Sequence, residues 1–82
     1  MVYPPFRILG SDNCVYCTKA RDLLSKYKIP YIYVNVSEDD REKQNLIRQG
    51  LKTVPQVWDS QNNYVGGFNS LNLLVESTYG NT

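Results

Sequence analysis

The sequence predicts a small α/β domain in which a mixed β-sheet carries helices on both faces. Short runs rich in aromatic and β-branched residues alternate with helix-like stretches in the order β-α-β-α-β-β-α. The length of 82 residues suits one hydrophobic core, so residues 1–82 are expected to form one domain. The first two strands should be parallel, and the crossover between them right-handed.

The first half of the chain supplies a strand, a helix and a second strand. Phe6–Gly10 is expected as the first strand, and the turn-forming residues 10–13 end it. A helix should follow over Cys14–Lys28, because Pro30 prevents a longer one. Tyr31–Val36 is rich in aromatic and β-branched residues and predicts the second strand. The expected apolar stripe of the helix comprises Tyr16, Ala20, Leu23, Leu24 and Tyr27.

A second helix is expected between Ser37 and Gly50. Ser37 can act as its N-cap, and Gly50 can end it. Acidic side chains in a first turn are favourable because they face the positive end of the helix dipole. These acids would be Glu38, Asp39 and Asp40. The apolar face is thin, so this helix should be the loosest element of the fold. It would comprise Leu46, Ile47 and Leu51.

The last third of the chain predicts a β-hairpin and a final helix. Gln56–Trp58 and Tyr64–Val65 should pair across the turn-rich residues 59–63. Gly66-Gly67 then breaks the second of these strands. The final helix would have Asn69 or Ser70 as its N-cap. Its inward side chains would be Leu71, Leu74 and Val75.

Composition excludes several classes of function. The net charge is +1 and no Lys/Arg cluster exceeds two residues, so no nucleic-acid-binding surface is expected. The longest apolar stretches are about five residues, far short of the roughly 20 that a membrane helix needs. The N-terminal segment Met1–Pro5 has neither the charged nor the apolar region of a signal peptide. We therefore expect a cytoplasmic protein.

The only two cysteines, Cys14 and Cys17, stand three positions apart where a strand gives way to a helix. Residues at this spacing on a helix lie roughly 5–6 Å apart, within the distance a disulfide tolerates. Half of a zinc site and a chance pair of buried thiols are the alternatives. A structural zinc site needs four Cys or His ligands, and the chain has no His and no third Cys. The motif therefore favours a redox-active dithiol.

The two cysteines are expected to have different roles. Cys14 lies at the helix start, where free N–H groups and the helix dipole favour a thiolate. Cys17 lies one turn further on, nearer the core. Cys14 should therefore attack, and Cys17 should resolve the mixed disulfide. Lys19 and Arg21 add positive charge nearby, but on a helix such residues usually form a solvated face, and we assign them no catalytic role.

Three motifs together resemble the glutaredoxin family: Cys14-Val15-Tyr16-Cys17, Thr53-Val54-Pro55 and Gly66-Gly67. The resemblance covers nearly the whole chain and is strongest to the small dithiol glutaredoxins of bacteriophages. It implies a thioredoxin-type fold with a four-stranded mixed sheet flanked by helices. It also implies a cis peptide bond before Pro55, and glutathione as the reducing co-substrate with no metal.

The resemblance further implies a glutathione site. The backbone of Val54 would pair with the cysteine of glutathione, and a cis Pro55 would keep metal away from the dithiol. The N–H groups at the start of the last helix would bind a carboxylate. The implied glutathione-binding residues are Tyr16, Thr53, Val54, Pro55, Gly67, Phe68 and Asn69.

Two departures from the family pattern suggest weaker glutathione binding. The family usually has Asp where this chain has Asn69, which costs a charge-assisted hydrogen bond to the γ-glutamyl ammonium. The usual Lys before the CxxC motif is also missing, and Ser11-Asp12-Asn13 takes its place. Lys52 could supply the cation instead.

The expected function is that of a monomeric dithiol glutaredoxin. It would reduce protein disulfides and glutathione mixed disulfides, with ribonucleotide reductase as a client implied by the resemblance. One alternative is a hydrogen donor reduced by thioredoxin reductase, although such proteins usually have Ser-Gly-Phe-Arg-Pro in place of residues 66–69 onward. Another is an iron–sulfur carrier in which Cys14 from two chains and glutathione provide the ligands. Tyr16 and the available Cys17 argue against this carrier.

Overall fold

The computed structural model describes residues 4–80 of the chain. The first three residues of the N-terminal segment Met1–Pro5, which was compared above with a signal peptide, lie outside this range. The elements follow the expected order β-α-β-α-β-β-α. They are β1 (Phe6–Gly10), α1 (Val15–Lys26), β2 (Tyr31–Asn35), α2 (Asp40–Arg48), β3 (Gln56–Trp58), β4 (Tyr64–Gly66) and α3 (Phe68–Tyr79).

The four strands form one mixed sheet in the order β2-β1-β3-β4. Strand β1 runs parallel to β2, with Ile8 opposite Tyr33, and antiparallel to β3, with Ile8 opposite Val57. The hairpin of β3 and β4 closes through the Asp59 side chain, which accepts hydrogen bonds from the N–H groups of Gln61 and Asn63, both at 2.9 Å. The sheet is therefore the mixed four-stranded one that the sequence and the resemblance implied.

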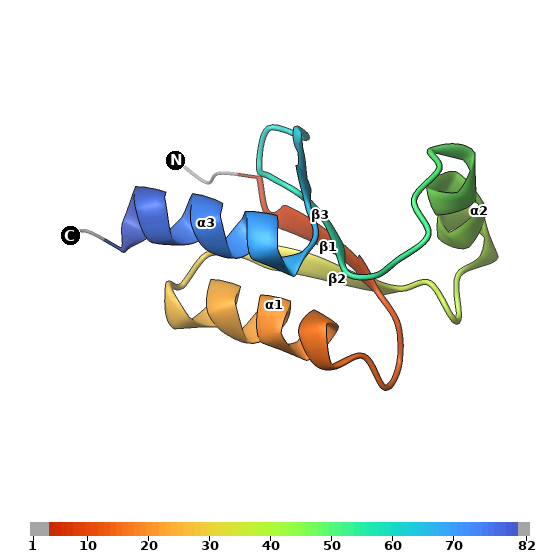
Figure 1. Cartoon of the computed structure of the whole chain (residues 1–82), viewed down its shortest axis with the longest axis horizontal. Coiled ribbons are helices and arrows are strands. Elements are labelled where there is room, and N and C mark those ends of the chain that lie inside the picture. Colours follow the sequence, from red (N-terminus) through yellow and green to blue (C-terminus); the bar gives the residue numbers. More distant parts are fainter. Residues whose placement is uncertain (1–3, 81–82) are drawn as a thin grey trace.

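Helices α1 and α3 cover one face of the sheet, and on the other face α2 contributes only Leu46 to the core. Helices α1 and α3 lie side by side along one face, and α2 stands beyond one end of the strands (Figure 1). The core under α1 and α3 comprises Phe6, Ile8, Ala20, Leu24, Ile29, Val57, Leu71 and Val75. The smaller core on the opposite face comprises Leu9, Val36, Leu46 and Trp58. Because β1 is central, its alternating side chains Ile8 and Leu9 enter the two cores separately.

Helix α1 differs in one respect from the expected apolar stripe. Cys17, Ala20 and Leu24 are buried, but Tyr16 is 54% exposed. The helix begins at Val15, with Cys14 as its N-cap. Tyr16 therefore lies in the first turn, where its ring points away from the sheet core. The stripe prediction was wrong for Tyr16, and Cys17 takes its place in the core.

Helix α2 begins later than the sequence suggested. Its N-cap is Asp39, whose side chain accepts a hydrogen bond from the N–H of Glu42 at 3.1 Å, so the prediction of Ser37 as the cap was wrong. The N–H of Ser37 is bound instead by the side chain of Asn35 at 2.9 Å, which makes a turn directly after β2. This turn delays the helix start. Gly50, with a φ of +75°, follows the helix end as expected.

The apolar face of α2 is even thinner than expected. Leu46 is buried at 5% exposure, Leu51 is half-buried, and Ile47 is 57% exposed. Leu46 is thus the one buried residue of α2. No helix among residues 4–80 is long and apolar enough to cross a membrane.

Helix α3 begins earlier than expected. Its N-cap is Gly67, which offers no side-chain hydrogen bond, and Asn69 and Ser70 lie within the first turn. The prediction of either residue as the cap was therefore wrong. Leu71 and Val75 are buried and Leu74 packs against them, as expected. The uncapped start leaves the first backbone N–H groups of α3 free for a ligand.

Candidate active site

Cys14 and Cys17 form a disulfide at the carboxyl end of β1, where the chain enters α1. Their Cα atoms are 5.2 Å apart, within the range that accommodates a disulfide. Cys17 is 1% exposed, whereas Cys14 is partly exposed. The structure thus gives the pair the asymmetry expected of an attacking and a resolving thiol.

Cys14 lies where a negative sulfur is stabilised. As the N-cap of α1, its Sγ accepts a hydrogen bond from the backbone N–H of Cys17 at 3.1 Å. The positive end of the α1 dipole acts in the same direction. In the reduced protein both effects favour a thiolate at Cys14.

The segment Thr53-Val54-Pro55, which leads into the neighbouring strand β3, faces this sulfur. The Val54–Pro55 peptide bond is cis, as the resemblance implied. The carbonyl oxygen of Val54 lies 3.8 Å from the Sγ of Cys14. A sulfur atom bound to Cys14 therefore lies beside the free backbone edge of Val54.

Gln56 anchors this segment, a role that the sequence did not reveal. It is the one buried polar residue among those described, at 5% exposure. Its Nε2 donates to the backbone oxygen of Thr53 at 3.0 Å and to the Thr53 hydroxyl at 3.2 Å. Its Oε1 accepts a hydrogen bond from the hydroxyl of Tyr64 on the neighbouring strand. Gln56 thus fixes the loop before Pro55 to the β3–β4 hairpin.

All seven residues expected to bind glutathione line one groove of about 180 Å³. The ring of Tyr16 lies 5.8 Å from that of Phe68, and these two rings form one wall. A Cβ added at Gly67 would lie 3.6 Å from the carbonyl oxygen of Pro55, so the start of α3 lies close to the cis-proline segment. We call this the cis-proline groove. Its residues are Tyr16, Thr53, Val54, Pro55, Gly67, Phe68 and Asn69.

Lys52, considered as a replacement cation, lies outside the cis-proline groove. It is exposed and lines an adjoining hollow beside α2, which shares Thr53 and Val54 with that groove. Lys19 stacks over Tyr16, with its Nζ 5.0 Å from the ring centroid. Lys19 therefore brings positive charge closer to the groove wall than the sequence suggested.

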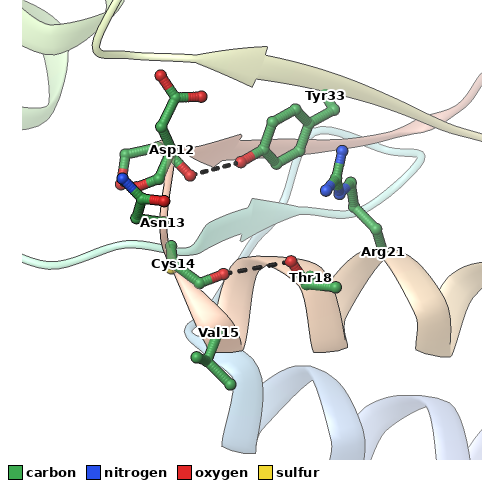
Figure 2. A pocket seen from close by; sticks show the side chains of 8 residues that line it. Asp12, Asn13, Cys14, Val15, Thr18, Arg21 and Tyr33 are labelled. Carbon is green, nitrogen blue, oxygen red and sulfur yellow. Dashed lines mark hydrogen bonds between the residues drawn. The ribbon is translucent and has the colours of Figure 1, made fainter.

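Cys14 itself lines a second, larger groove of about 540 Å³ (Figure 2). This groove shares no residue with the cis-proline groove. We call it the Arg21 groove. Its residues are Ser11, Asp12, Asn13, Cys14, Val15, Thr18, Arg21 and Tyr33. No sequence pattern groups these residues, because β2 contributes Tyr33 from a distant part of the chain.

The loop before Cys14 is tied to β2 by two hydrogen bonds. The Tyr33 hydroxyl donates to the backbone oxygen of Ser11 at 3.2 Å (Figure 2), and Asn35 Nδ2 donates to Asp12 Oδ1 at 2.8 Å. Asn13 adopts a left-handed φ of 57°, which an Asn tolerates better than most residues. Strand β2 therefore holds the loop that positions Cys14.

The described residues contain no group of three or more His, Cys, Asp or Glu side chains that could hold a metal ion. The arrangement offers a different chemistry. A partly exposed sulfur at a helix start, a buried partner sulfur and a facing cis proline support exchange between thiols and disulfides. The fold and the site define a thiol–disulfide oxidoreductase.

Comparison with known proteins identifies the family. The model of the Glutaredoxin family matches residues 7–62. The chain is 30% identical to the glutaredoxin of Enterobacteria phage T4 over 81 residues, covering 80% of this chain and 93% of that protein. It is 30% identical to glutaredoxin 1 of Escherichia coli over 69 residues, covering 74% and 80%. This protein belongs to the glutaredoxin family.

Solved structures show the same fold. The dithiolic glutaredoxin 2-C-Grx1 of Trypanosoma brucei brucei has a TM-score of 0.76 at 20% identity, covering 92% of this chain and 80% of that one. A buckwheat glutaredoxin solved as a glutathione complex has a TM-score of 0.71 at 21% identity, covering 93% and 70%. The glutaredoxin-like NrdH-redoxin of Escherichia coli, described as having a thioredoxin-like activity profile, has a TM-score of 0.74 at 21% identity, covering 85% and 93%.

Proposed function

We propose that this oxidoreductase is a glutathione-dependent dithiol glutaredoxin. The observation that carries the proposal is the cis-proline groove. It gathers residues from α1, the Thr53 loop and the start of α3 beside the sulfur of Cys14. The glutathione complex of the buckwheat relative adds support, because that protein has the same fold.

Reduction of a client disulfide proceeds in two exchanges. The Cys14 thiolate attacks one client sulfur, forms a mixed disulfide and releases the other client sulfur as a thiolate, which takes up a proton. The thiolate of Cys17 then attacks the Sγ of Cys14 and releases the second client thiol. The client gains two electrons and two protons, and the Cys14–Cys17 disulfide remains.

Glutathione regenerates the dithiol. One glutathione thiolate attacks the Sγ of Cys14, releases Cys17 and forms a mixed disulfide in the cis-proline groove. A second glutathione attacks the bound glutathione sulfur and releases Cys14 as a thiolate, giving oxidised glutathione. Because Cys14 is stabilised as a thiolate by the N–H of Cys17, it is a good leaving group in this last step.

Three groups in the groove are suited to glutathione. The free backbone edge of Val54 can pair with the cysteine residue of the tripeptide. The uncapped N–H groups at the start of α3 can bind its γ-glutamyl carboxylate. Asn69, exposed in the same turn, can accept a hydrogen bond from the γ-glutamyl ammonium.

The client and the setting are further parts of the proposal. We propose a monomer that works in the reducing cytoplasm on disulfide-containing or glutathionylated proteins. Ribonucleotide reductase is one such client, on the strength of the resemblance to phage glutaredoxins. Neither nucleic acid nor a membrane is a proposed partner.

The proposed electron source is tested against its main alternative. NrdH-redoxin matches this chain at 21% identity, which shows a common fold and leaves the reductant open. The pure protein would be supplied with NADPH and either glutathione plus glutathione reductase, or thioredoxin reductase. We expect reduction of the glutathione–mercaptoethanol mixed disulfide with the first system. Turnover with thioredoxin reductase alone would refute the proposal.

An iron–sulfur carrier is distinguished by colour. A cluster bound by Cys14 of two chains and two glutathiones would give a brown protein and a dimer. We expect a colourless monomer after purification under anaerobic conditions with glutathione. Tyr16 inside the motif and the available Cys17 support this expectation.

A further inference from the structure

We propose that the Arg21 groove binds the polypeptide of a disulfide-bonded client, and that Arg21 selects clients with an acidic side chain next to the reactive cysteine. The inference rests on the proposed function, since it concerns which clients the same Cys14 reduces. It assigns to Arg21 a role in specificity that the sequence did not indicate.

The position and size of the Arg21 groove fit a polypeptide. Cys14 lines it directly, and its volume of about 540 Å³ is three times that of the cis-proline groove, about 180 Å³. Glutathione has one residue on each side of its cysteine, whereas a client chain continues in both directions. A client joined to Cys14 can use the Val54 edge on one side, and its continuing chain then requires room on the other. The Arg21 groove provides that room.

The charge of Arg21 is held in place and lacks a carboxylate partner. Its guanidinium carbon lies 4.4 Å from the centroid of the Tyr33 ring, and the side chain is half-buried. Among residues 4–80 no Asp or Glu forms an ion pair with it. A stacked guanidinium keeps its planar set of donors oriented, so it loses little conformational entropy when it binds a carboxylate.

Asp12 places a negative charge at the end of the Arg21 groove that lies away from Arg21. Asp12 and Arg21 lie on opposite sides of Tyr33 (Figure 2). One oxygen of Asp12 already accepts a hydrogen bond from Asn35, and its negative charge disfavours an acidic side chain at that end. Val15, 67% exposed, and Thr18 supply an apolar and a hydroxyl-bearing wall between them. An acidic side chain of the client is therefore directed to the Arg21 end.

The test uses disulfide-cyclised peptides in matched pairs, with Glu or the isosteric Gln one or two residues from the reactive cysteine, on either side of it. Prereduced protein is mixed with each peptide, and the second-order rate constant of disulfide reduction is measured without glutathione. In at least one pair we expect the Glu peptide to react about three to ten times faster, as for a partly exposed charge-assisted hydrogen bond. The ratio of the Glu to the Gln rate constant should decrease as the salt concentration rises, because salt screens the charge of Arg21.

Three variants locate the effect. Arg21→Gln should remove the preference for Glu, and Arg21→Lys should retain part of it, because the charge remains without the stacked planar geometry. Lys26→Gln removes the same charge from the far end of α1 and should keep the full preference. The rate of reduction of the glutathione–mercaptoethanol disulfide, measured for each variant, normalises the peptide rates, so that a change in the reactivity of Cys14 is separated from a change in selectivity.

Equal rates for Glu and Gln in every pair, or a preference that survives in Arg21→Gln, would overturn the inference. Failure of the proposed function gives a different result. In that case glutathione would not support turnover of the small mixed disulfide, while the peptide preference measured with prereduced protein would still be present.

Discussion

The ring of Tyr33 lies directly against the backbone of Gly10. A Cβ added at Gly10 would lie 2.8 Å from two ring carbons of Tyr33, closer than real side chains approach. The lack of a side chain at Gly10 therefore lets the ring cross the end of β1, where its hydroxyl binds Ser11 and its face meets Arg21. This contact joins β1, β2 and α1 immediately beside Cys14.

Gly10→Ala should destabilise the protein by about 1–3 kcal/mol, because the added methyl group displaces the Tyr33 ring. Urea unfolding gives the free energy change. In a Tyr33→Ala background the same Gly10→Ala change should cost little, since no ring is left to displace. An equal cost in both backgrounds would mean that the two residues do not interact.

Replacing each cysteine with Ser should affect activity differently. Cys14→Ser should abolish reduction of both protein disulfides and glutathione mixed disulfides, because the exposed sulfur at the helix start is lost. Cys17→Ser should keep deglutathionylation and lose most protein-disulfide reduction, which needs the resolving thiol. It should also trap one glutathione per chain, visible by mass spectrometry. A folded Cys17→Ser protein without deglutathionylation would contradict the assignment of Cys14 as the nucleophile.

Asn69→Asp should lower the Michaelis constant for glutathione about two- to fivefold, because a carboxylate replaces an amide facing the γ-glutamyl ammonium. The gain should shrink at high salt. Ser70→Asp is the matched control, since it adds the same charge to the first turn of α3 outside the groove lining. If both variants lower the constant equally, the effect comes from general charge and not from contact with glutathione.

The hydroxyl of Tyr27 donates to both carboxylate oxygens of Glu76 at 3.0 Å, and this hydrogen bond is the main reason that the pKa of Tyr27 is raised above its usual value of 10.0. Partial desolvation and the charge of Glu76 act in the same direction. A raised pKa means that folding favours the protonated phenol. The contribution of this hydrogen bond to the free energy of unfolding is therefore fully present below about pH 10. It is lost as the pH rises through the folded-state pKa of Tyr27.

The stability difference between the unchanged protein and Tyr27→Phe should accordingly be constant from pH 7 to 9 and shrink above pH 10. Urea midpoints measured at each pH check this. Glu76→Gln should weaken the pH dependence, because the acceptor charge is removed. A difference that stays constant to pH 12 would show that the Tyr27–Glu76 bond does not contribute in solution.

The amides of α2 should exchange hydrogen faster than those of α1 and α3. Leu46 is the one buried residue of α2, whereas α1 buries Cys17, Ala20 and Leu24. Helices with few buried contacts open locally at low free-energy cost. Native-state hydrogen exchange by NMR measures the protection of each helix. Equal protection in α1 and α2 would mean that α2 opens only with global unfolding.

The sequence by itself determined the order of elements and the reactive pair. Period-two and period-3.6 patterns reflect which side chains face a core, so the strand Phe6–Gly10 and the inward positions Leu71 and Val75 could be predicted. The CxxC spacing at a helix start brings two cysteines near each other through local structure alone, so the pairing of Cys14 with Cys17 needed no tertiary information.

Helix starts were less predictable, because several polar residues compete for each cap. Asn35 binds the N–H of Ser37, and the cap moves to Asp39. Helix α3 starts at Phe68, after Gly67 as an N-cap that makes no side-chain hydrogen bond. The residue that becomes the N-cap depends on where the preceding strand ends, and strand pairing in the sheet determines that end.

Only the tertiary structure decided what surrounds Cys14 and Cys17. Folding brings Val54 to 3.8 Å from the Sγ of Cys14, and Tyr33 to Arg21, across long stretches of chain. Gln56 becomes the anchor of the Thr53 loop because β3 is buried between β1 and β4. Such contacts depend on strand order and register, which local sequence patterns do not encode. The chemistry of the Cys14–Cys17 pair therefore follows from the sequence, whereas the shape of the two grooves beside it follows from the fold.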